Sequence, residues 1–237
     1  MAQAAYLQVY NALRRKITSG EFAIGSLLPA EPSLEKMFRV SRITVRRAID
    51  ILSQEGYVKA QRGIGTVVLD YQVTQNLNRI TSMTETLKQN GYEVRIKNMK
   101  IDIIPADEHF ADIFGVEAGT KLARVFRIVY ATGTPIIIAN NYIPYSSVEG
   151  IELYTNKFIS LYQFLREKYF LIIDMAQDII SAKNADAQEA EILSVKKGFA
   201  LLETKRKCLS NGQCICYDVV YARHDMYSFN ISLYNRD

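Results

Sequence analysis

Residues 40–68 read VSRITVRRAIDILSQEGYVKAQRGIGTVV, and this stretch indicates the fold of the first third of the chain. Ser41 can cap a helix, because its hydroxyl accepts a hydrogen bond from a free amide of the first turn. Apolar residues then recur at helical spacing and predict a buried stripe. The stripe consists of Val45, Ala48, Ile49 and Leu52. Two short strands are expected next, around the RGIG turn of residues 62–65, whose glycines permit a tight reversal.

Two more helices are expected before this stretch. Apolar side chains along residues 6–17 recur on one helix face, and PSLEKMF (residues 32–38) is typical of a short helix. The face of the first helix consists of Tyr6, Tyr10, Leu13 and Ile17. The sequence therefore predicts three helices followed by a two-stranded wing, which together form a first domain over residues 1–70.

The positive charge of the chain is concentrated in this first domain. Residues 1–70 hold 10 Lys/Arg and 6 Asp/Glu, whereas residues 71–237 hold 19 of each. A small basic module attached to an electrically neutral domain is typical of a protein that binds a polyanion.

The exposed side of the third helix has the residue types that read DNA. It carries Arg42, Thr44, Arg46 and Arg47. A helix with this face can lie in the major groove of double-stranded DNA, where Arg can bridge O6 and N7 of guanine. The Gly63 and Gly65 backbone can approach the neighbouring minor groove, whose negative potential attracts Arg62. The alternative is a merely solvated basic face, but the concentration of charge favours DNA.

Residues 28–68, LPAEPSLEKMFRVSRITVRRAIDILSQEGYVKAQRGIGTVV, resemble the winged helix-turn-helix domain of the GntR family of bacterial transcription regulators. The resemblance implies that Arg42, Thr44 and Arg46 make the principal DNA contacts, that Arg47 supports them, and that Gly63 and Gly65 form the wing. Pro32 and Ile64 depart from the family pattern, which often has Arg and Lys there. We therefore expect weaker affinity for the DNA backbone and a shallower salt dependence than in a typical member.

The rest of the chain reads as a second, α+β domain. Residues 71–78 are polar and without periodicity, which indicates a linker, and residues 79–237 alternate strand and helix patterns around a mainly antiparallel sheet. Four segments resemble the effector-binding UTRA domain of the HutC subfamily, which has a chorismate-lyase-like fold. They are RITSMTETL (79–87), RVFRIVYATGTPIIIANNYIP (124–144), ISLYQFLREKYFL (159–171) and NGQCICYDVVYARHDMYSF (211–229). The resemblance implies effector binding and dimerisation.

Both the local residue pattern and the resemblance to the UTRA domain indicate candidate effector-binding residues. Helix starts and a strand offer hydroxyl, amide and guanidinium donors to an anion. The residues are Ser82, Met83, Thr84, Arg127, Ser160 and Tyr162. A structural ion pair of Arg127 inside the sheet remains an alternative. Val129, Ala139 and Cys216 replace an Arg and two acids that sugar-phosphate sensors commonly have, so we expect a more apolar pocket. The effector class expected is a small metabolite, phosphorylated or carboxylate.

Other function classes find less support. A lyase-like enzyme is the main alternative, but only two histidines are present, and Asp102, Asp174 and Asp178 read as solvent-exposed. A DNA-binding protein without an effector would leave the second domain unexplained. The clustered Cys208, Cys214 and Cys216 are expected to be buried thiols, and no metal or cofactor is expected.

The sequence as a whole predicts a cytoplasmic, ligand-responsive transcription regulator that is not an enzyme. No apolar run is long enough to span a membrane, and no signal peptide is recognised. The expected protein is a repressor that binds a palindromic operator as a homodimer and is released by its effector.

Overall fold

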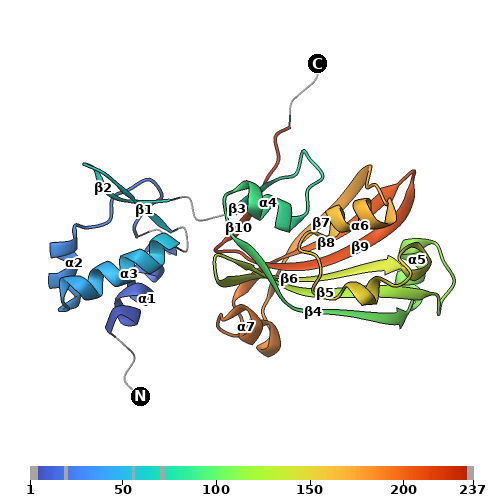
Figure 1. Cartoon of the computed structure of the whole chain (residues 1–237), viewed down its shortest axis with the longest axis horizontal. Coiled ribbons are helices and arrows are strands. Elements are labelled where there is room, and N and C mark those ends of the chain that lie inside the picture. Colours follow the sequence, from blue (N-terminus) through green and yellow to red (C-terminus); the bar gives the residue numbers. More distant parts are fainter. Residues whose placement is uncertain (1–4, 19–20, 55–56, 70–72, 234–237) are drawn as a thin grey trace. The chain divides into compact units, whose positions relative to one another are not determined.

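The computed structural model describes residues 5–18, 21–54, 57–69 and 73–233. The chain divides into two compact units, residues 1–72 and 73–237 (Figure 1).

The first unit has the predicted order of three helices and a wing. Its elements are α1 (Ala5–Thr18), α2 (Glu31–Phe38), α3 (Arg42–Gln54), β1 (Val58–Gln61) and β2 (Gly65–Val68). All four residues of the predicted α3 stripe are buried, as are Leu13, Ile17 and Leu34, and α3 contacts both α1 and α2. Pro32 lies in the first turn of α2, where its fixed φ favours helix formation and its missing N–H needs no partner.

The β1–β2 hairpin is a regular antiparallel pair that a preceding segment joins. Val58 pairs with Val68 and Gln61 with Gly65. Leu27 forms an isolated bridge with Val67, so a third chain segment lies beside β2. Gly65 has φ +130°, and a Cβ atom there would lie 3.3 Å from the Leu27 side chain. The positive φ favours glycine at position 65, and a larger residue there would also require the Leu27 side chain to shift slightly.

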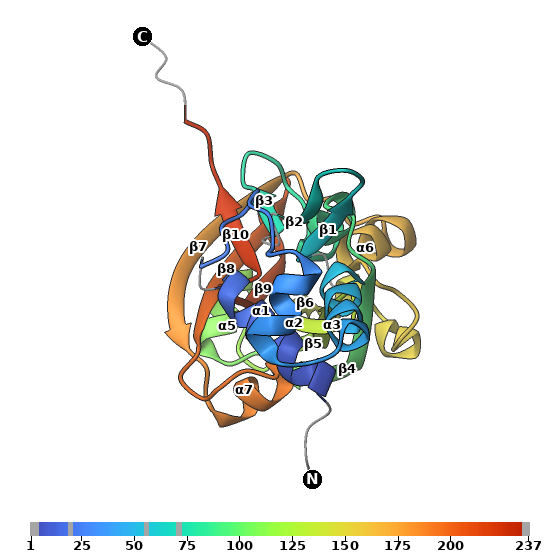
Figure 2. The same cartoon turned by 90° about the vertical axis from the view of Figure 1, so that its left-hand side faces the viewer.

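The second unit is built on a six-stranded antiparallel sheet, in agreement with the predicted, mainly antiparallel sheet. Its strands are β4 (Val94–Pro105), β5 (Lys121–Ala131), β6 (Thr134–Pro144), β7 (Met175–Asn184), β8 (Ala200–Ser210) and β9 (Gln213–Arg223). Their order across the sheet is β4-β5-β6-β9-β8-β7, so β4 and β7 form its two edges (Figure 2).

Helices pack on both faces of this sheet. They are α4 (Met83–Gln89), α5 (Glu108–Phe114), α6 (Leu161–Tyr169) and α7 (Ala187–Leu193), with 3-10 turns at Tyr145–Ser147 and Ile151–Tyr154. Leu161 and Leu165 of α6 pack against Val125 of β5. Residues of α5 and α7 pack against the other face, which includes Leu122 and Ile138 (Figure 1).

The predicted linker over residues 71–78 differs from the structure. Residues 71 and 72 lie outside the described part, but Val73–Asn76 form strand β3, which pairs in parallel with β10 (Tyr227–Asn230). Val73 and Gln75 are buried, and the Gln75 amide donates to the Thr81 carbonyl and accepts from the Tyr227 hydroxyl, both at 2.9 Å. The sequence did not indicate this strand, because its residues are polar and their hydrogen-bond partners lie elsewhere in the chain.

Among the described residues, every helix is too short or too polar to cross a membrane.

We expect Leu161→Ala to lower the free energy of unfolding of the second unit by about 2–5 kcal/mol, since the side chain is fully buried between α6 and the sheet. Leu153→Ala is the matched control, because Leu153 is 69% exposed and its loss should change the free energy by less than about 0.5 kcal/mol. Urea unfolding followed by circular dichroism measures both. Equal effects of the two substitutions would contradict the assigned core.

Candidate functional site

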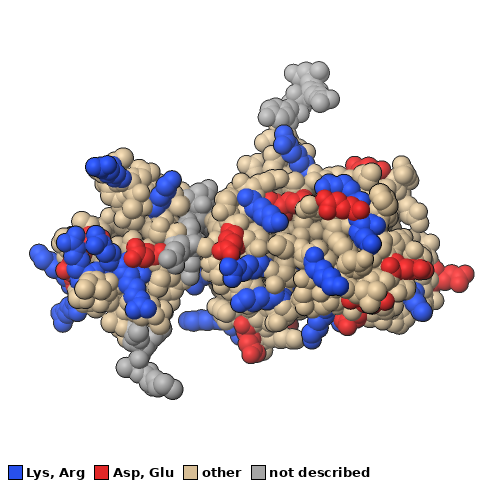
Figure 3. All heavy atoms as spheres, viewed as in Figure 1, with Lys and Arg blue, Asp and Glu red and all other residues tan. Residues whose placement is uncertain are grey.

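The third helix presents its predicted polar face to solvent. Arg42, Arg46 and Arg47 are exposed and Thr44 is half-buried, while the apolar stripe faces the core. Figure 3 shows Lys and Arg side chains gathered over the part of the first unit that contains α2 and α3. The structure therefore places these four predicted residues on one accessible surface.

Glu31, at the start of α2, holds two of these arginines. Its carboxylate accepts a 2.8 Å hydrogen bond from Arg42 Nε and lies 3.3 Å from Arg46 Nε. The hydrogen bond from Arg42 lowers the pKa of Glu31 below its usual value. The two guanidinium groups are thus oriented by one residue, which the sequence reading had not singled out.

The other two positions of this face have different neighbours. The guanidinium carbon of Arg47 lies 4.1 Å from the centre of the Tyr6 ring, a cation–π contact that connects α3 to α1. The Thr44 hydroxyl shares a 2.9 Å hydrogen bond with the Ser41 hydroxyl, and the Thr44 amide donates weakly to Ser41 at 3.4 Å. Arg47 is therefore restrained by packing, whereas Thr44 belongs to the helix cap.

The wing tip is exposed, as a groove-binding element requires. Arg62, Gly63 and Gly65 are exposed, and Gly63 has φ +78°. Ile64, where the related pattern often has Lys, is 61% exposed at the tip. The tip therefore offers backbone, one cation and one apolar side chain to a binding partner.

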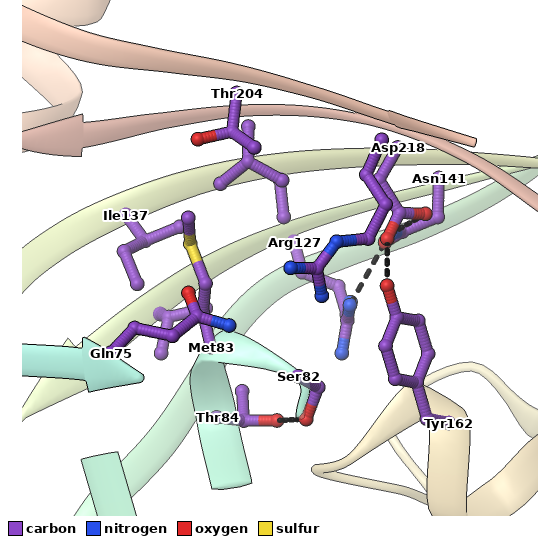
Figure 4. A pocket seen from close by; sticks show the side chains of 14 residues that line it. Gln75, Ser82, Met83, Thr84, Arg127, Ile137, Asn141, Tyr162, Thr204 and Asp218 are labelled. Atoms are coloured by element: carbon purple, nitrogen blue, oxygen red, sulfur yellow. Dashed lines mark hydrogen bonds between the residues drawn. The ribbon is translucent and has the colours of Figure 1, made fainter. Parts of the chain in front are cut away.

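A second candidate site is a cavity of about 30 Å³ on the face of the sheet that α4 and α6 cover (Figure 4). Its apolar wall consists of Met83, Val129, Ile137, Ala139 and Val220, and its polar wall of Gln75, Ser82, Thr84, Arg127, Asn141, Tyr162, Thr204, Arg206 and Asp218. This volume suffices for about two water molecules.

Arg127 lies at the centre of the polar wall and is 5% exposed. It donates to the Asn141 side-chain oxygen at 2.8 Å and to the Ile159 carbonyl at 3.0 Å. Burial lowers the pKa of its guanidinium, since the charged form loses water. No carboxylate contacts Arg127 directly among the described residues, so the simple ion-pair alternative does not describe its environment.

Asp218 is connected to Arg127 through Asn141, which accepts from Arg127 and donates to the Asp218 carboxylate. Its carboxylate accepts hydrogen bonds from Asn141 at 2.6 Å, from the Tyr162 hydroxyl, and from the Cys216 thiol at 3.0 Å. Figure 4 shows Tyr162 pointing from α6 toward Asp218. Burial raises the pKa values of Tyr162 and Cys216, so both stay protonated and act as donors at neutral pH.

Arg206 and Asp178 form an ion pair beside the cavity. Arg206 Nε and Nη2 donate to the two Asp178 oxygens at 2.6 and 2.7 Å, and Nη1 donates to the Thr81 carbonyl at 2.8 Å. Although burial opposes its charge, the hydrogen bonds to Asp178 raise the pKa of Arg206 above its usual value. The expectation that Asp178 is solvent-exposed is therefore wrong, because its strand places it opposite Arg206.

Two polar atoms of the cavity wall have no hydrogen-bond partner among the described residues. They are Arg127 Nε and the Thr204 hydroxyl, and both are buried. Buried polar atoms are usually hydrogen-bonded, so an unpaired donor beside a cavity indicates a place for a ligand or water oxygen.

Five of the six predicted effector-binding residues line this cavity, namely Ser82, Met83, Thr84, Arg127 and Tyr162. Ser160 lies outside it. Its hydroxyl caps α6 through Gln163 and donates to Glu85 at 2.9 Å. The predicted free amides at the start of α4 are partly occupied, because Ser82 and Glu85 form a reciprocal capping box.

The sequence reading missed five polar residues of the wall: Gln75, Asn141, Thr204, Arg206 and Asp218. Strand register could have indicated four of them, because Asn141, Asp218 and Arg206 face one another across three strands and Thr204 shares their face. The replacements at Val129 and Ala139 lie in the apolar wall, and the three cysteines are free and buried. Within the described ranges, no group of acids, histidines and cysteines is suited to hold a metal.

Two family descriptions match the chain. Bacterial regulatory proteins of the gntR family match residues 5–68, and the UTRA domain matches residues 89–228. The HTH-type transcriptional repressor NagR of Bacillus subtilis (strain 168) is 30% identical over 226 residues, covering 94% of this chain and 92% of that protein. The mannosyl-D-glycerate transport/metabolism system repressor MngR of Escherichia coli (strain K12) is 24% identical and covers 95% and 94%, respectively.

Solved structures agree with these matches. The crystal structure of PhnF from Mycobacterium smegmatis has 25% sequence identity and a TM-score of 0.68, over 96% of this chain and 100% of that chain. The matched families and relatives are transcription regulators rather than enzymes, as the sequence predicts. The chain therefore belongs to the GntR family of bacterial transcription regulators, with a DNA-binding helix-turn-helix domain followed by a UTRA domain.

Proposed function

We propose that the protein is a repressor that binds a palindromic operator as a homodimer and is released by a small anionic metabolite. The observation that carries the proposal is the α3 surface, where Arg42 and Arg46 are both exposed and oriented by Glu31 above a fully buried stripe. Two such surfaces related by a two-fold axis fit half-sites about one helical turn apart. Because it acts on DNA, its site of action is the cytoplasm.

The DNA contacts divide by chemistry. Arg42 and Arg46 read guanine edges, Thr44 contacts a base or a phosphate from the first turn, and Arg47 supports the helix on the backbone. Arg62 enters the minor groove beside the backbone of Gly63 and Gly65. Pro32 and Ile64 supply no cation, so phosphate contacts are fewer and the salt dependence is shallow.

The effector binds in the cavity beside Arg127. Its oxygen accepts from Arg127 Nε, which has no partner among the described residues, and the apolar wall contacts its body. Ser82, Thr84 and Tyr162 add hydroxyl groups, while Ser160 acts through Glu85. Since the cavity holds only about two waters, Met83 and its neighbours move apart when the effector enters.

Release follows from linkage between the two sites. An effector that favours an arrangement in which the two helix-turn-helix modules no longer fit both half-sites weakens DNA binding, and DNA weakens effector binding by the same factor. The relative MngR is named as a repressor of mannosyl-D-glycerate transport and metabolism, which illustrates the kind of pathway that such a regulator controls.

In vitro selection from random duplexes at one salt concentration should recover a palindrome. Arg42→Ala/Arg46→Ala should abolish its enrichment, since each bidentate guanine contact contributes about 1–3 kcal/mol of discrimination. Arg95→Ala/Arg166→Ala is the control, because it removes the same charge from exposed positions of the second unit. Enrichment without a palindrome, or equal loss in both variants, would refute the proposed reading surface.

Glu31→Gln should reduce the discrimination between the selected operator and a scrambled duplex by about 1–3 kcal/mol, because the amide no longer holds both guanidinium groups. Affinity for the scrambled duplex should rise, since one negative charge near the phosphates is lost. Fluorescence anisotropy measures both affinities. Glu21→Gln removes the same charge away from α3, and an identical response of the two variants would exclude a positioning role for Glu31.

Thermal-shift screening with carboxylates and sugar phosphates should find a metabolite that stabilises the protein and weakens operator binding. Arg127→Gln should then weaken its binding by about tenfold or more, because a charged hydrogen bond contributes about 1.5–3 kcal/mol. Arg124→Gln is the control on the same strand, since Arg124 lies on the opposite face and pairs with Asp102. A stabilising metabolite whose saturation leaves operator affinity unchanged would disprove the release mechanism.

A further inference from the structure

One side chain of the α3 surface has a chemistry that the proposed DNA contacts do not use. Ile43 lies in the first turn of α3 and is 81% exposed, more than any other large apolar side chain among the described residues of the first unit. Ile64 at the wing tip follows with 61%. Single exposed apolar residues are common on protein surfaces, so the position of Ile43 decides whether its exposure has a function.

Ile43 lies in the middle of the exposed arc of α3. A helix turns by about 100° per residue, which places Arg46 about 60° to one side of Ile43 and Arg47 about 40° to the other. Arg42 follows beyond Arg46, and the buried stripe lies on the opposite side of the helix. Asp50 lies almost in line with Ile43, about 10 Å further along the axis. The first two turns of α3 therefore surround one apolar side chain with cations.

Contacts within the first unit hold these arginines to the sides of the arc. Glu31 of α2 accepts a 2.8 Å hydrogen bond from Arg42 and lies 3.3 Å from Arg46 Nε. The guanidinium carbon of Arg47 lies 4.1 Å from the centre of the Tyr6 ring of α1. Arg42 and Arg46 thus point toward α2 and Arg47 toward α1, which leaves the centre of the arc to the isoleucine.

Neither helix formation nor packing accounts for an isoleucine at position 43. Its branched side chain loses rotamer freedom in a helix, so alanine, lysine or arginine would favour α3 more. A side chain that is mostly exposed also contributes little to the core. The same side chain would gain free energy from a partner that removes it from water, since each buried methyl or methylene group strengthens binding about fourfold.

The major groove of DNA offers one partner of this kind. The C5 methyl of thymine is the apolar group that base edges present there, whereas the other positions present hydrogen-bond donors and acceptors. Isoleucine has no hydrogen-bonding group, so covering a donor or acceptor with it would leave that polar atom buried without a partner. The chemistry of the side chain therefore favours thymine over the other three bases.

We propose that Ile43 packs against the C5 methyl of a thymine and thereby selects this base in each half-site. Residues three apart on a helix lie about 5–6 Å from one another, and base pairs are about 3.4 Å apart. The thymine therefore lies within about two base pairs of the guanine that Arg46 reads. The inference rests on the α3 reading surface of the proposed function and adds a base that this surface recognises.

Uracil lacks only the C5 methyl of thymine, so it tests this contact without changing base pairing. The duplex recovered by in vitro selection is compared by fluorescence anisotropy with duplexes that carry uracil in place of one thymine in each half-site. At one position, uracil should weaken binding of the wild-type protein by about fourfold for each half-site. Ile43→Ser should bind the thymine and uracil duplexes equally, because the short polar side chain no longer covers the methyl. The four affinities form a double-mutant cycle, which separates this contact from the general effect of either change.

Ile24→Ser is the matched control, because Ile24 is 52% exposed in the same unit but lies outside α3. It should retain the wild-type response to uracil, and the thermal midpoints of both variants verify that they are folded. A wild-type protein that does not distinguish uracil from thymine, an equal loss in Ile43→Ser, or a selected half-site without thymine near the guanine overturns the contact. The reading surface stands in those cases if Arg42→Ala/Arg46→Ala still abolishes the palindrome. Selection that recovers no palindrome overturns the reading surface together with this inference.

Discussion

The antiparallel register of four strands places charged and polar side chains in a row across one face of the sheet. From β6 to β7 the row consists of Asn141, Asp218, Arg206 and Asp178. Burying an arginine without a partner is strongly unfavourable, and here Asp178 on the neighbouring strand pairs with Arg206, while Asn141 donates to Asp218. A slip of one residue in any strand would turn its member to the opposite face, so the buried charges and the register stabilise each other.

This constraint also shapes the cavity. The adjacent row consists of Arg127, Ala139, Val220, Thr204 and Ile180. Arg127 and Thr204 therefore lie on either side of two small apolar residues, and each has a polar atom without a partner among the described residues. Each nitrogen of Arg206 donates to Asp178 or Thr81, whereas Arg127 Nε has no partner among the described residues, so Arg127 is the arginine that we propose to bind an effector oxygen.

Local patterns in the sequence predicted most of the fold. Helix stripes indicated the three helices of the first unit, and strand patterns indicated the mainly antiparallel sheet of the second, because those signals depend on neighbours a few positions away. The β3–β10 pair was missed, since its polar strand is stabilised by a partner about 150 residues distant. Asp218 and Arg206 were missed for the same reason, because their role depends on cross-strand register and not on any local motif.

The arginines of the two candidate sites differ in how strongly their present contacts restrain them, and this difference fits the function proposed for each site. Arg42 and Arg46 are bound to Glu31 on an exposed surface, where water and salt weaken ion pairs. Phosphates and base edges can replace such a partner without unfolding anything. Arg127 and Arg206 are buried, so breaking their present hydrogen bonds is unfavourable, whereas Arg127 Nε has no partner among the described residues. In the proposed function, the effector completes this hydrogen-bond network, and the resulting shift passes along a sheet whose register does not allow independent movement of its strands.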